Sequence, residues 1–422
     1  MKRRSKLLRL ATNKTRDVFK WLYPGMGVKR WILYASFGLL LIVIGSSYLR
    51  TEEYLIAQLL DAIAVISGII ILILGIKRLM RSLIAAFVPV PKDAQLMDLL
   101  YQRKQLSRGP RVVTIGGGTG LSVLLSGLKE HTSNITAIVT VADDGGSSGR
   151  LRQQFDILPP GDIRNCLVAL ADASTLMRDL FQFRFKDNSE LNGHSFGNLF
   201  ITVMTQLTGD FDQAIKETSK VLALRGQVIP STLSNVKLVA QHKNGTVTEG
   251  EYNIPRAHLP ISSVYLKPAG SRATPEALKA IEEAQIVILG PGSLYTSVLP
   301  NLLIKDIADA VTASSAVKVY VCNVMTQPGE TDGYSASEHI KALIAHTGER
   351  ILDYCIMHSG HISSEALKRY EKENAHLVIN DKKIVEKMGY HVIENNAVTT
   401  GQTIRHDPEK LAKIILGILE EI

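Results

Sequence analysis

Residues 112–128, VVTIGGGTGLSVLLSGL, decide the fold that this sequence predicts. An apolar run from Arg111 to Ile115 precedes a glycine turn, and leucines then recur at helical spacing from Leu121. A buried strand, a glycine turn and a helix start in this order are typical of nucleotide-binding α/β domains, because free backbone N–H groups and the helix dipole attract phosphate. The predicted phosphate loop comprises Gly116, Gly117, Gly118, Thr119 and Gly120.

This loop departs from the G-x-G-x-x-G pattern of dinucleotide-binding domains, because Leu121 stands where the last glycine belongs. The departure argues against the usual mode of NAD binding. Taken alone, the glycines also fit a tight turn that requires positive φ angles.

Strand-like runs alternate with helical patterns beyond the loop, at Ile135 to Ala142, Gln285 to Leu289 and Val317 to Asn323. Such alternation predicts an α/β fold, with a Rossmann-like, mostly parallel sheet that carries helices on both faces. Val236 to Ile254 contains Asn244-Gly245 between two β-rich runs and predicts a hairpin outside this pattern.

Acidic and hydroxyl residues follow the second predicted strand. Two aspartates at this point lie where a Rossmann-type site meets a ribose, and they can equally bind a cation. A solvated turn is the alternative interpretation. The candidate residues are Asp143, Asp144, Ser147, Ser148 and Arg150.

Two further polar segments each precede an apolar helix. Asp162, Arg164 and Asn165 open the first helix, where Asp162 has an alternative role as an N-cap. His194 and Asn198 open the second; the histidine can serve as a general base or a ribose contact, although a lone histidine is more often structural.

A second glycine loop follows the strand at 285–289. Since ligands of open α/β sheets bind beyond the carboxyl ends of the strands, we expect it to face the same crevice as the first loop. The residues that follow the predicted strand at 317–323 have an alternative interpretation, as an ordinary loop with a Pro-Gly turn. The candidates from both segments are Gly290, Pro291, Gly292, Ser293, Tyr295, Asn323 and Thr326.

The amino-terminal quarter has a different character. A basic segment at 1–30 precedes uncharged apolar runs at about 31–49 and 54–76, which predict a transmembrane hairpin within 31–78. Basic residues flank both outer ends, so the positive-inside rule places the amino terminus and the main domain in the cytoplasm, at the inner membrane. Asp61 interrupts the second run, and a carboxylate within a membrane indicates a functional site by default; the favoured interpretation is that Asp61 is near enough to the turn to reach the interface. A linker at 79–109 then leads to a domain at 110–422.

Charge and cysteine content narrow the classes of protein to which this chain can belong. The 48 Lys and Arg exceed the 40 Asp and Glu, but the excess gathers before an apolar run, which favours a membrane over nucleic acid. The 3 cysteines are far apart and lack metal-ligand spacing, so neither disulfides nor a cysteine metal site is expected.

Several segments together resemble the bacterial gluconeogenesis factor family, which is related to 2-phospho-L-lactate transferases of coenzyme F420 biosynthesis. The matching segments are GGGTGLSVLLSGLK, VTVADDGGSSGRLR, PPGDIRNCL, GHSFGNLF, LRGQVIPST, GPGSLYTSVLPNLL and NVMTQPGETDGYSASEH, with weaker similarity around residues 405–408. The transmembrane hairpin departs from the shorter, soluble members.

The resemblance implies a homodimer that binds UDP-sugars such as UDP-N-acetylglucosamine and is needed for cell shape and wall synthesis during gluconeogenic growth, with wall-synthesis proteins as further partners. Thr119, Asp143, Asp144, Asn198 and the loop 290–293 would line the pocket. It also implies that Asp143 or Asp144 can hold a divalent cation, Mg²⁺ or Ca²⁺.

Three functions follow as hypotheses. A regulatory nucleotide-sugar-binding protein is favoured, because no catalytic constellation is recognisable. The alternative is a metal-dependent transferase of the 2-phospho-L-lactate type, with Arg150 or Arg164 stabilising phosphate charge. An NAD-dependent oxidoreductase ranks last, because the third glycine is missing.

Overall fold

The computed structural model describes residues 28–48, 54–87, 103–186, 190–400 and 403–421. The chain divides into two compact units, residues 1–102 and residues 103–422. The predicted basic segment as far as residue 27, the predicted turn and residues 88–102 of the predicted linker lie outside the described residues.

The first unit contains two antiparallel helices, α2 (Val28–Tyr48) and α3 (Leu55–Phe87). Both are long and apolar enough to cross a membrane, judged by length and composition. Glycines let their backbones approach closely, since a Cβ on Gly38 would lie 2.7 Å from the carbonyl oxygen of Gly68. α3 continues beyond the predicted end of the second span at Ile76, so residues 79–87 of the predicted linker are helical.

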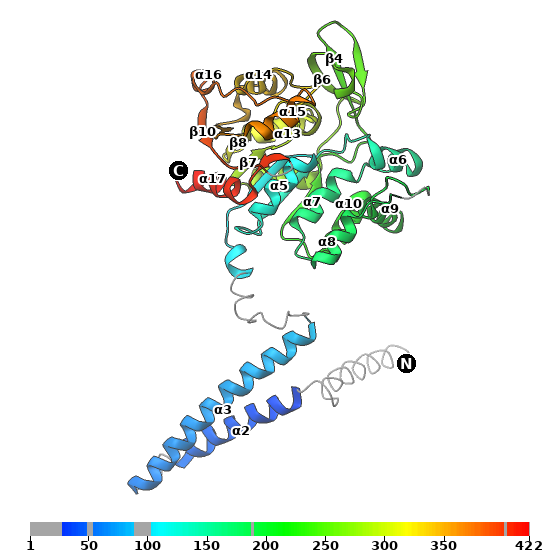
Figure 1. The fold of residues 1–422 in the computed structure, drawn as a ribbon. Helices are drawn as coiled ribbons and strands as arrows, with labels where there is room; N and C mark the ends of the chain where they lie inside the picture. Colours follow the sequence, from blue (N-terminus) through cyan, green and yellow to red (C-terminus); the bar gives the residue numbers. More distant parts are fainter. Residues whose placement is uncertain (1–27, 49–53, 88–102, 187–189, 401–402, 422) are drawn as a thin grey trace. The chain divides into compact units, whose positions relative to one another are not determined.

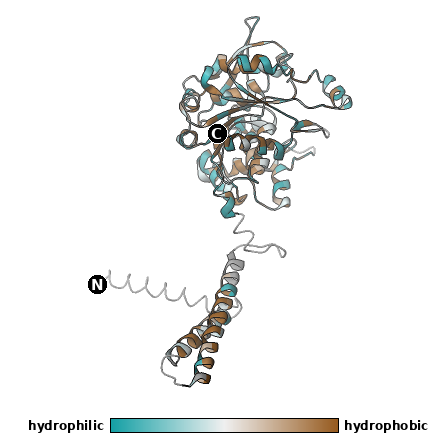
Figure 2. Cartoon of the chain, turned by 90° about the vertical axis from the view of Figure 1, so that its left-hand side faces the viewer, coloured by the Kyte–Doolittle hydropathy of each residue, from teal (hydrophilic) through white to brown (hydrophobic). Residues whose placement is uncertain are grey.

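The second unit is built on a parallel sheet of seven strands in the order β10-β9-β8-β7-β1-β2-β3. The central strands are apolar and fully buried because helices cover both faces (Figure 2). The α/β fold and its parallel sheet are confirmed. The strands are β1 (Val112–Gly116), β2 (Ile135–Val139), β3 (Gln227–Pro230), β7 (Ile286–Leu289), β8 (Val317–Val321), β9 (Tyr354–His358) and β10 (His391–Asn395).

Helices connect the strands, and the first of them begins inside the predicted glycine loop (Figure 1). The α-helices are α5 (Gly118–Leu128), α6 (Gly146–Phe155), α7 (Gly161–Leu170), α8 (Thr175–Gln182), α9 (Phe196–Thr208), α10 (Phe211–Val221), α11 (Pro275–Glu282), α12 (Leu299–Leu302), α13 (Lys305–Ala313), α14 (Ala336–Thr347), α15 (Ser364–Glu371), α16 (Lys382–Lys387) and α17 (Pro408–Glu420). Shorter helical turns are η1 (Pro255–Ala257), η2 (Leu294–Val298) and η3 (Glu349–Ile351).

Two small antiparallel sheets stand apart from the main sheet. The first has the order β5-β4-β6 and contains the hairpin predicted at 236–254. Its strands are β4 (Lys237–His242), β5 (Val247–Glu249) and β6 (Ile261–Lys267), and the second sheet pairs β11 (Val398–Thr400) with β12 (Ile404–His406).

The strand order places a topological switch point between β1 and β7. From β1 the chain proceeds through β2 to β3 on one side, while β7, β8, β9 and β10 extend on the other. Connections leave a crevice beyond the carboxyl ends of the two strands at such a point, and ligands of open α/β sheets bind there. Both predicted glycine loops follow these two strands.

Candidate functional site

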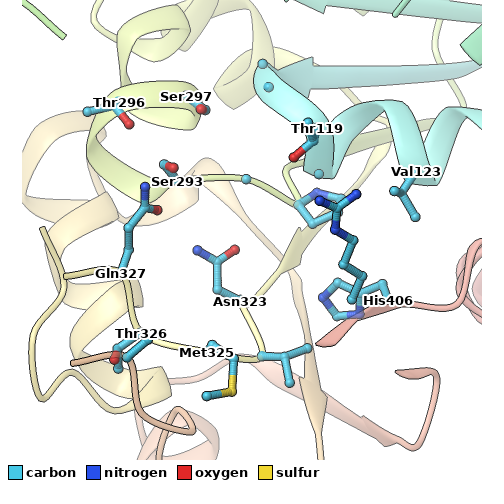
Figure 3. A pocket seen from close by; sticks show the side chains of 18 of the residues that line it. Thr119, Val123, Ser293, Thr296, Ser297, Asn323, Met325, Thr326, Gln327 and His406 are labelled. Atoms are coloured by element: carbon cyan, nitrogen blue, oxygen red, sulfur yellow. The ribbon is translucent and has the colours of Figure 1, made fainter. Parts of the chain in front are cut away.

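A cavity of about 530 Å³ lies beyond the carboxyl ends of β1, β7 and β8 (Figure 3). Figure 3 shows Thr119, Ser293 and Asn323 at this cavity, in the segments that follow β1, β7 and β8, respectively. Eleven of the residues predicted from sequence contribute to its lining. They are Gly117, Gly118, Thr119, Gly120, Asp143, Asp162, Pro291, Gly292, Ser293, Asn323 and Thr326.

The two glycine loops meet directly at this cavity. A Cβ on Gly120 would lie 2.6 Å from the carbonyl oxygen of Pro291, so only glycine allows the loops to approach this closely. Gly118 has a φ of +66°, which also favours glycine. The buried Asn301 amide holds both segments, since its Nδ2 donates to the carbonyl oxygens of Gly116 at 3.2 Å and Ser297 at 2.8 Å.

Asp162 adds a carboxylate to the glycine loop. It lies in the first turn of α7, but the N-cap position belongs to Pro160, so the N-cap role considered for Asp162 is wrong. Its side chain instead accepts a hydrogen bond from the Gly118 backbone N–H. A Cβ on Gly117 would lie 2.5 Å from Asp162 Oδ2, which shows how closely the carboxylate packs on the loop.

Asp143 and Asp144 are adjacent in sequence but face different surroundings. Asp143 lines the cavity, and its Oδ1 accepts a hydrogen bond from the Gly145 N–H at 2.9 Å. Asp144 accepts from the backbone N–H of Tyr252 at 2.8 Å and packs against Gly250. Asp144 therefore fixes the loop after β5, which brings Glu251 to the cavity wall.

Carboxylates dominate the electrostatics of this wall. Burial, together with the charge of Asp143, raises the pKa of Asp162 to about 7. Burial, together with the charges of Asp143 and Asp162, raises the pKa of Glu251 to about 9. Glu251 is therefore largely protonated at neutral pH, whereas Asp162 changes its protonation state near neutral pH.

Positive charge lies on a different wall, which is formed by β12. Arg405 and His406 line the cavity, and Arg405 is the single Lys or Arg among its described lining residues. Burial lowers the pKa of His406 to about 4, so this imidazole is neutral at physiological pH. The Arg405 guanidinium is thus the group best suited to an anionic ligand.

The other eleven predicted residues lie outside the lining of this cavity. Gly116, Gly290 and Tyr295 lie next to lining residues, and the Tyr295 hydroxyl pairs with that of Tyr334 at 2.9 Å. Asp144 binds the loop after β5. The remainder surround α6, α7 and α9: Ser147, Ser148, Arg150, Arg164, Asn165, His194 and Asn198.

Internal hydrogen bonds explain why the residues on these helices face elsewhere. Ser147 Oγ lies 3.0 Å from His194 Nδ1 and accepts from Asn198 Nδ2 at 3.1 Å. Arg150 donates to the Asn192 carbonyl oxygen at 2.7 Å, and Arg164 donates to Asn165 Oδ1 at 2.6 Å. These polar groups position the segments behind Asp143.

Sequence reasoning left out fourteen lining residues. Several stand in motifs that it did quote, such as Thr296 and Ser297 after the second loop, or Arg405 and His406. Others, such as Glu251 and Tyr370, had no recognisable motif. The full set is Val123, Glu251, Thr296, Ser297, Val324, Met325, Gln327, Pro328, Tyr370, Glu373, Ala375, Ile404, Arg405 and His406.

Among the described residues, no group of three or more Asp, Glu, His or Cys side chains is arranged so that it could hold a metal ion. Asp143 and Asp162 nevertheless both line the cavity. Mg²⁺ commonly binds through one or two carboxylates and completes its coordination with ligand phosphates and water. The cation predicted at Asp143 or Asp144 stays a prediction.

Comparison with known proteins places the chain in a family. The family model of 2-phospho-L-lactate transferase CofD matches residues 112–398. The gluconeogenesis factor of Bacillus subtilis is 49% identical over 75% of this chain and 100% of its own length. The chain belongs to the gluconeogenesis factor family. A relative from Nostoc sp., named for the same factor, is 46% identical over 96% of this chain and 93% of its own length.

A solved structure from the same family supports the fold. A crystal structure of a UPF0052 family member from Bacillus halodurans has 49% identity and a TM-score of 0.71, covering 73% of this chain and 99% of its own. Members of this length correspond to the second unit alone. The Nostoc relative also aligns with much of the amino-terminal unit, so family members differ in whether they carry it.

Proposed function

We propose that the second unit is a regulatory domain that binds a UDP-sugar, such as UDP-N-acetylglucosamine, in the cavity between the two glycine loops. The meeting of these loops at the switch point is the observation that carries the proposal. Their backbone N–H groups and the start of α5 suit a diphosphate. The cavity volume falls within the range of about 300–1,000 Å³ that small-molecule sites occupy.

The charges suggest how the ligand is oriented. The diphosphate lies toward Thr119, Ser293 and Arg405, while sugar or ribose hydroxyls donate to the carboxylates of Asp143 and Asp162. A divalent cation shared by these two carboxylates and the phosphates would offset their repulsion. In the cell, the bound state would couple precursor supply to wall synthesis and cell shape during gluconeogenic growth, through contacts with wall-synthesis proteins.

Isothermal titration of residues 103–422 with UDP-N-acetylglucosamine, UDP-glucose, UTP and NAD tests the proposal. The relatives that consist of this unit alone show that it forms a separate protein. We expect saturable binding of a UDP-sugar, and Arg405→Ala should weaken it about 10- to 100-fold because a charge-assisted hydrogen bond is lost. Arg272→Ala is the matched control, since that exposed arginine pairs with Asp306 away from the cavity. Absence of UDP-sugar binding would contradict the proposal.

A transferase of the 2-phospho-L-lactate type is the second candidate. The family model carries that name, and Asp143 and Asp162 line the cavity where a donor's phosphates would lie. Incubation with Mg²⁺, a guanosine-linked phospholactyl donor and a deazaflavin acceptor distinguishes the two. Release of the guanosine nucleotide would favour the enzyme, whereas UDP-sugar binding without turnover favours the regulatory domain.

We also propose that α2 and α3 cross the inner membrane and hold the amino terminus and the second unit on its cytoplasmic side. Length, apolar composition and the flanking basic residues support this placement. The full chain should stay in the membrane fraction after alkaline carbonate washing, while residues 103–422 should be soluble. Extraction of the full chain by carbonate would contradict it.

A further inference from the structure

Three arginines lie around the start of α9, outside the lining of the cavity. Arg150 lies on α6 and Arg164 on α7, while Arg184 pairs with Ser195, the N-cap of α9, in an antiparallel bridge. α9 packs against both α6 and α7 (Figure 1). None of the three arginines lines the cavity between the two glycine loops. They therefore form a separate cationic cluster, which consists of Arg150, Arg164 and Arg184.

A tight turn before α9 anchors the two exposed arginines of this cluster. Arg150 Nη2 donates to the carbonyl oxygen of Asn192 at 2.7 Å, and Arg184 Nη1 donates to that of Gly193 at 2.5 Å. Gly193 has a φ of +79°, and a Cβ there would lie 3.1 Å from Arg150 Nη2, so glycine suits this position. A guanidinium group has five N–H donors, so both arginines keep further donors for a ligand.

Arg164 adds positive charge to the same place from the interior. It is 9% exposed, and a Cβ on Gly197 in the first turn of α9 would lie 2.7 Å from Arg164 Cδ. Arg164 Nη2 donates to Asn165 Oδ1 at 2.6 Å, whereas its buried Nε has no hydrogen-bond partner among the described residues. Because a buried donor without a partner costs free energy, an anion beside this guanidinium would offset that cost.

No carboxylate of the described residues pairs with this cluster. None of their ion pairs includes Arg150, Arg164 or Arg184. Burial, together with the charges of Arg150 and Arg184, lowers the pKa of His194, so this imidazole is neutral at physiological pH. Burial and the charge of Arg184 also lower the pKa of Arg164. The three guanidinium groups therefore repel one another, and a bound anion would relieve this repulsion.

We propose that the cationic cluster binds the phosphate group of a small phosphorylated metabolite, at a site separate from the cavity. A phosphate monoester carries about −1.5 to −2 charges at neutral pH and three acceptor oxygens, so it matches three guanidinium groups better than a carboxylate does. The first turn of α9 adds the positive end of a helix dipole. Asp162 and Arg164 lie two residues apart on α7, so this helix contributes to both sites. The proposal does not depend on what the cavity binds.

Isothermal titration of residues 103–422 with inorganic phosphate, glycerol 3-phosphate and acetate tests this site. We expect both phosphate compounds to bind and acetate to bind much more weakly. Arg150→Gln and Arg184→Gln should each weaken phosphate binding about 10-fold or more, because each removes charge-assisted hydrogen bonds. Phosphate should also raise the melting temperature of the wild type more than that of either variant. Both side chains are exposed, so urea unfolding without phosphate should match the wild type.

Arg272→Gln is the matched control, because this exposed arginine pairs with Asp306 and should bind phosphate like the wild type. Arg150→Lys keeps the charge and should lose less affinity than Arg150→Gln. A wild-type unit that binds neither phosphate compound at millimolar concentration, or that binds acetate equally well, would overturn the proposal. So would phosphate binding that Arg405→Ala abolishes and both glutamine variants of the cluster preserve, since that result would assign the phosphate to the cavity.

Discussion

Glu330 is a buried carboxylic acid beside the second glycine loop. Its burial makes the stability of the fold depend on pH. It is 3% exposed, and its Oε1 accepts a hydrogen bond from Thr296 Oγ1 at 3.0 Å. Burial raises its pKa to about 7, despite the opposing effect of this bond. Since the folded-state pKa exceeds the unfolded one, the protonated carboxyl favours folding at low pH, and this contribution is lost as pH rises through about 7.

Glu330→Gln should therefore make the free energy of unfolding less dependent on pH. We expect the variant to gain about 1 to 1.5 kcal/mol relative to wild type between pH 6 and pH 8.5, because glutamine cannot ionise. Urea unfolding at both pH values measures the difference. Asp162 and Glu251 also titrate, so the comparison with wild type isolates Glu330. Equal pH dependence in the two proteins would refute this role.

At the scale of single residues, sequence patterns predicted some residues of the cavity lining and missed others. Asp162 was predicted because it follows a Pro-Gly turn before an apolar helix, but its bond to Gly118 depends on how α7 packs beside α5. Arg405 reaches the cavity only because β12 folds back toward α5, far along the chain. Long-range packing of this kind leaves no local periodicity.

At the scale of elements, the loop after β5 acts as a wall of the site that Asp144 holds in place. Asp144→Ala removes the acceptor for the Tyr252 N–H, and we expect a loss of about 1 kcal/mol in stability and a severalfold weaker affinity for the UDP-sugar. Asp144→Asn keeps an acceptor oxygen and should bind nearly as well as wild type. Titrations with and without Mg²⁺ measure both variants.

The same pair of variants separates two roles for Asp144. If Asp144 only positions the loop, Asp144→Asn retains whatever enhancement Mg²⁺ gives to wild-type binding. If Asp144 ligates the cation, that enhancement disappears in Asp144→Asn, because a neutral amide is a weaker cation ligand than a carboxylate. The second result would contradict the positioning role.

Elements were more predictable than the contacts between them. The strands at 111–115 and 285–289 were recognisable as apolar runs that end in glycine loops, and the parallel sheet confirms them. Glu251 was not recognisable, because it lies between β5 and η1 in a stretch without a glycine loop or helical spacing. Its place in the site depends on contacts between distant segments, such as the bond that Asp144 accepts from the Tyr252 N–H.

At the scale of the whole molecule, the chain joins two apolar helices to an α/β unit that relatives also possess by itself. The Bacillus subtilis relative matches 75% of this chain over its full length, whereas the Nostoc relative matches 96%. The family fold therefore does not need α2 and α3. In the proposed function, the amino-terminal unit holds the UDP-sugar-binding unit at the membrane.

A crystal structure of residues 103–422 with UDP-N-acetylglucosamine tests the central claim most directly. We predict electron density for the diphosphate between the loops 117–120 and 291–293, with Arg405 within hydrogen-bond distance of a phosphate oxygen. Density for the nucleotide sugar at another surface, or an empty cavity at ligand concentrations that saturate binding in solution, would contradict it.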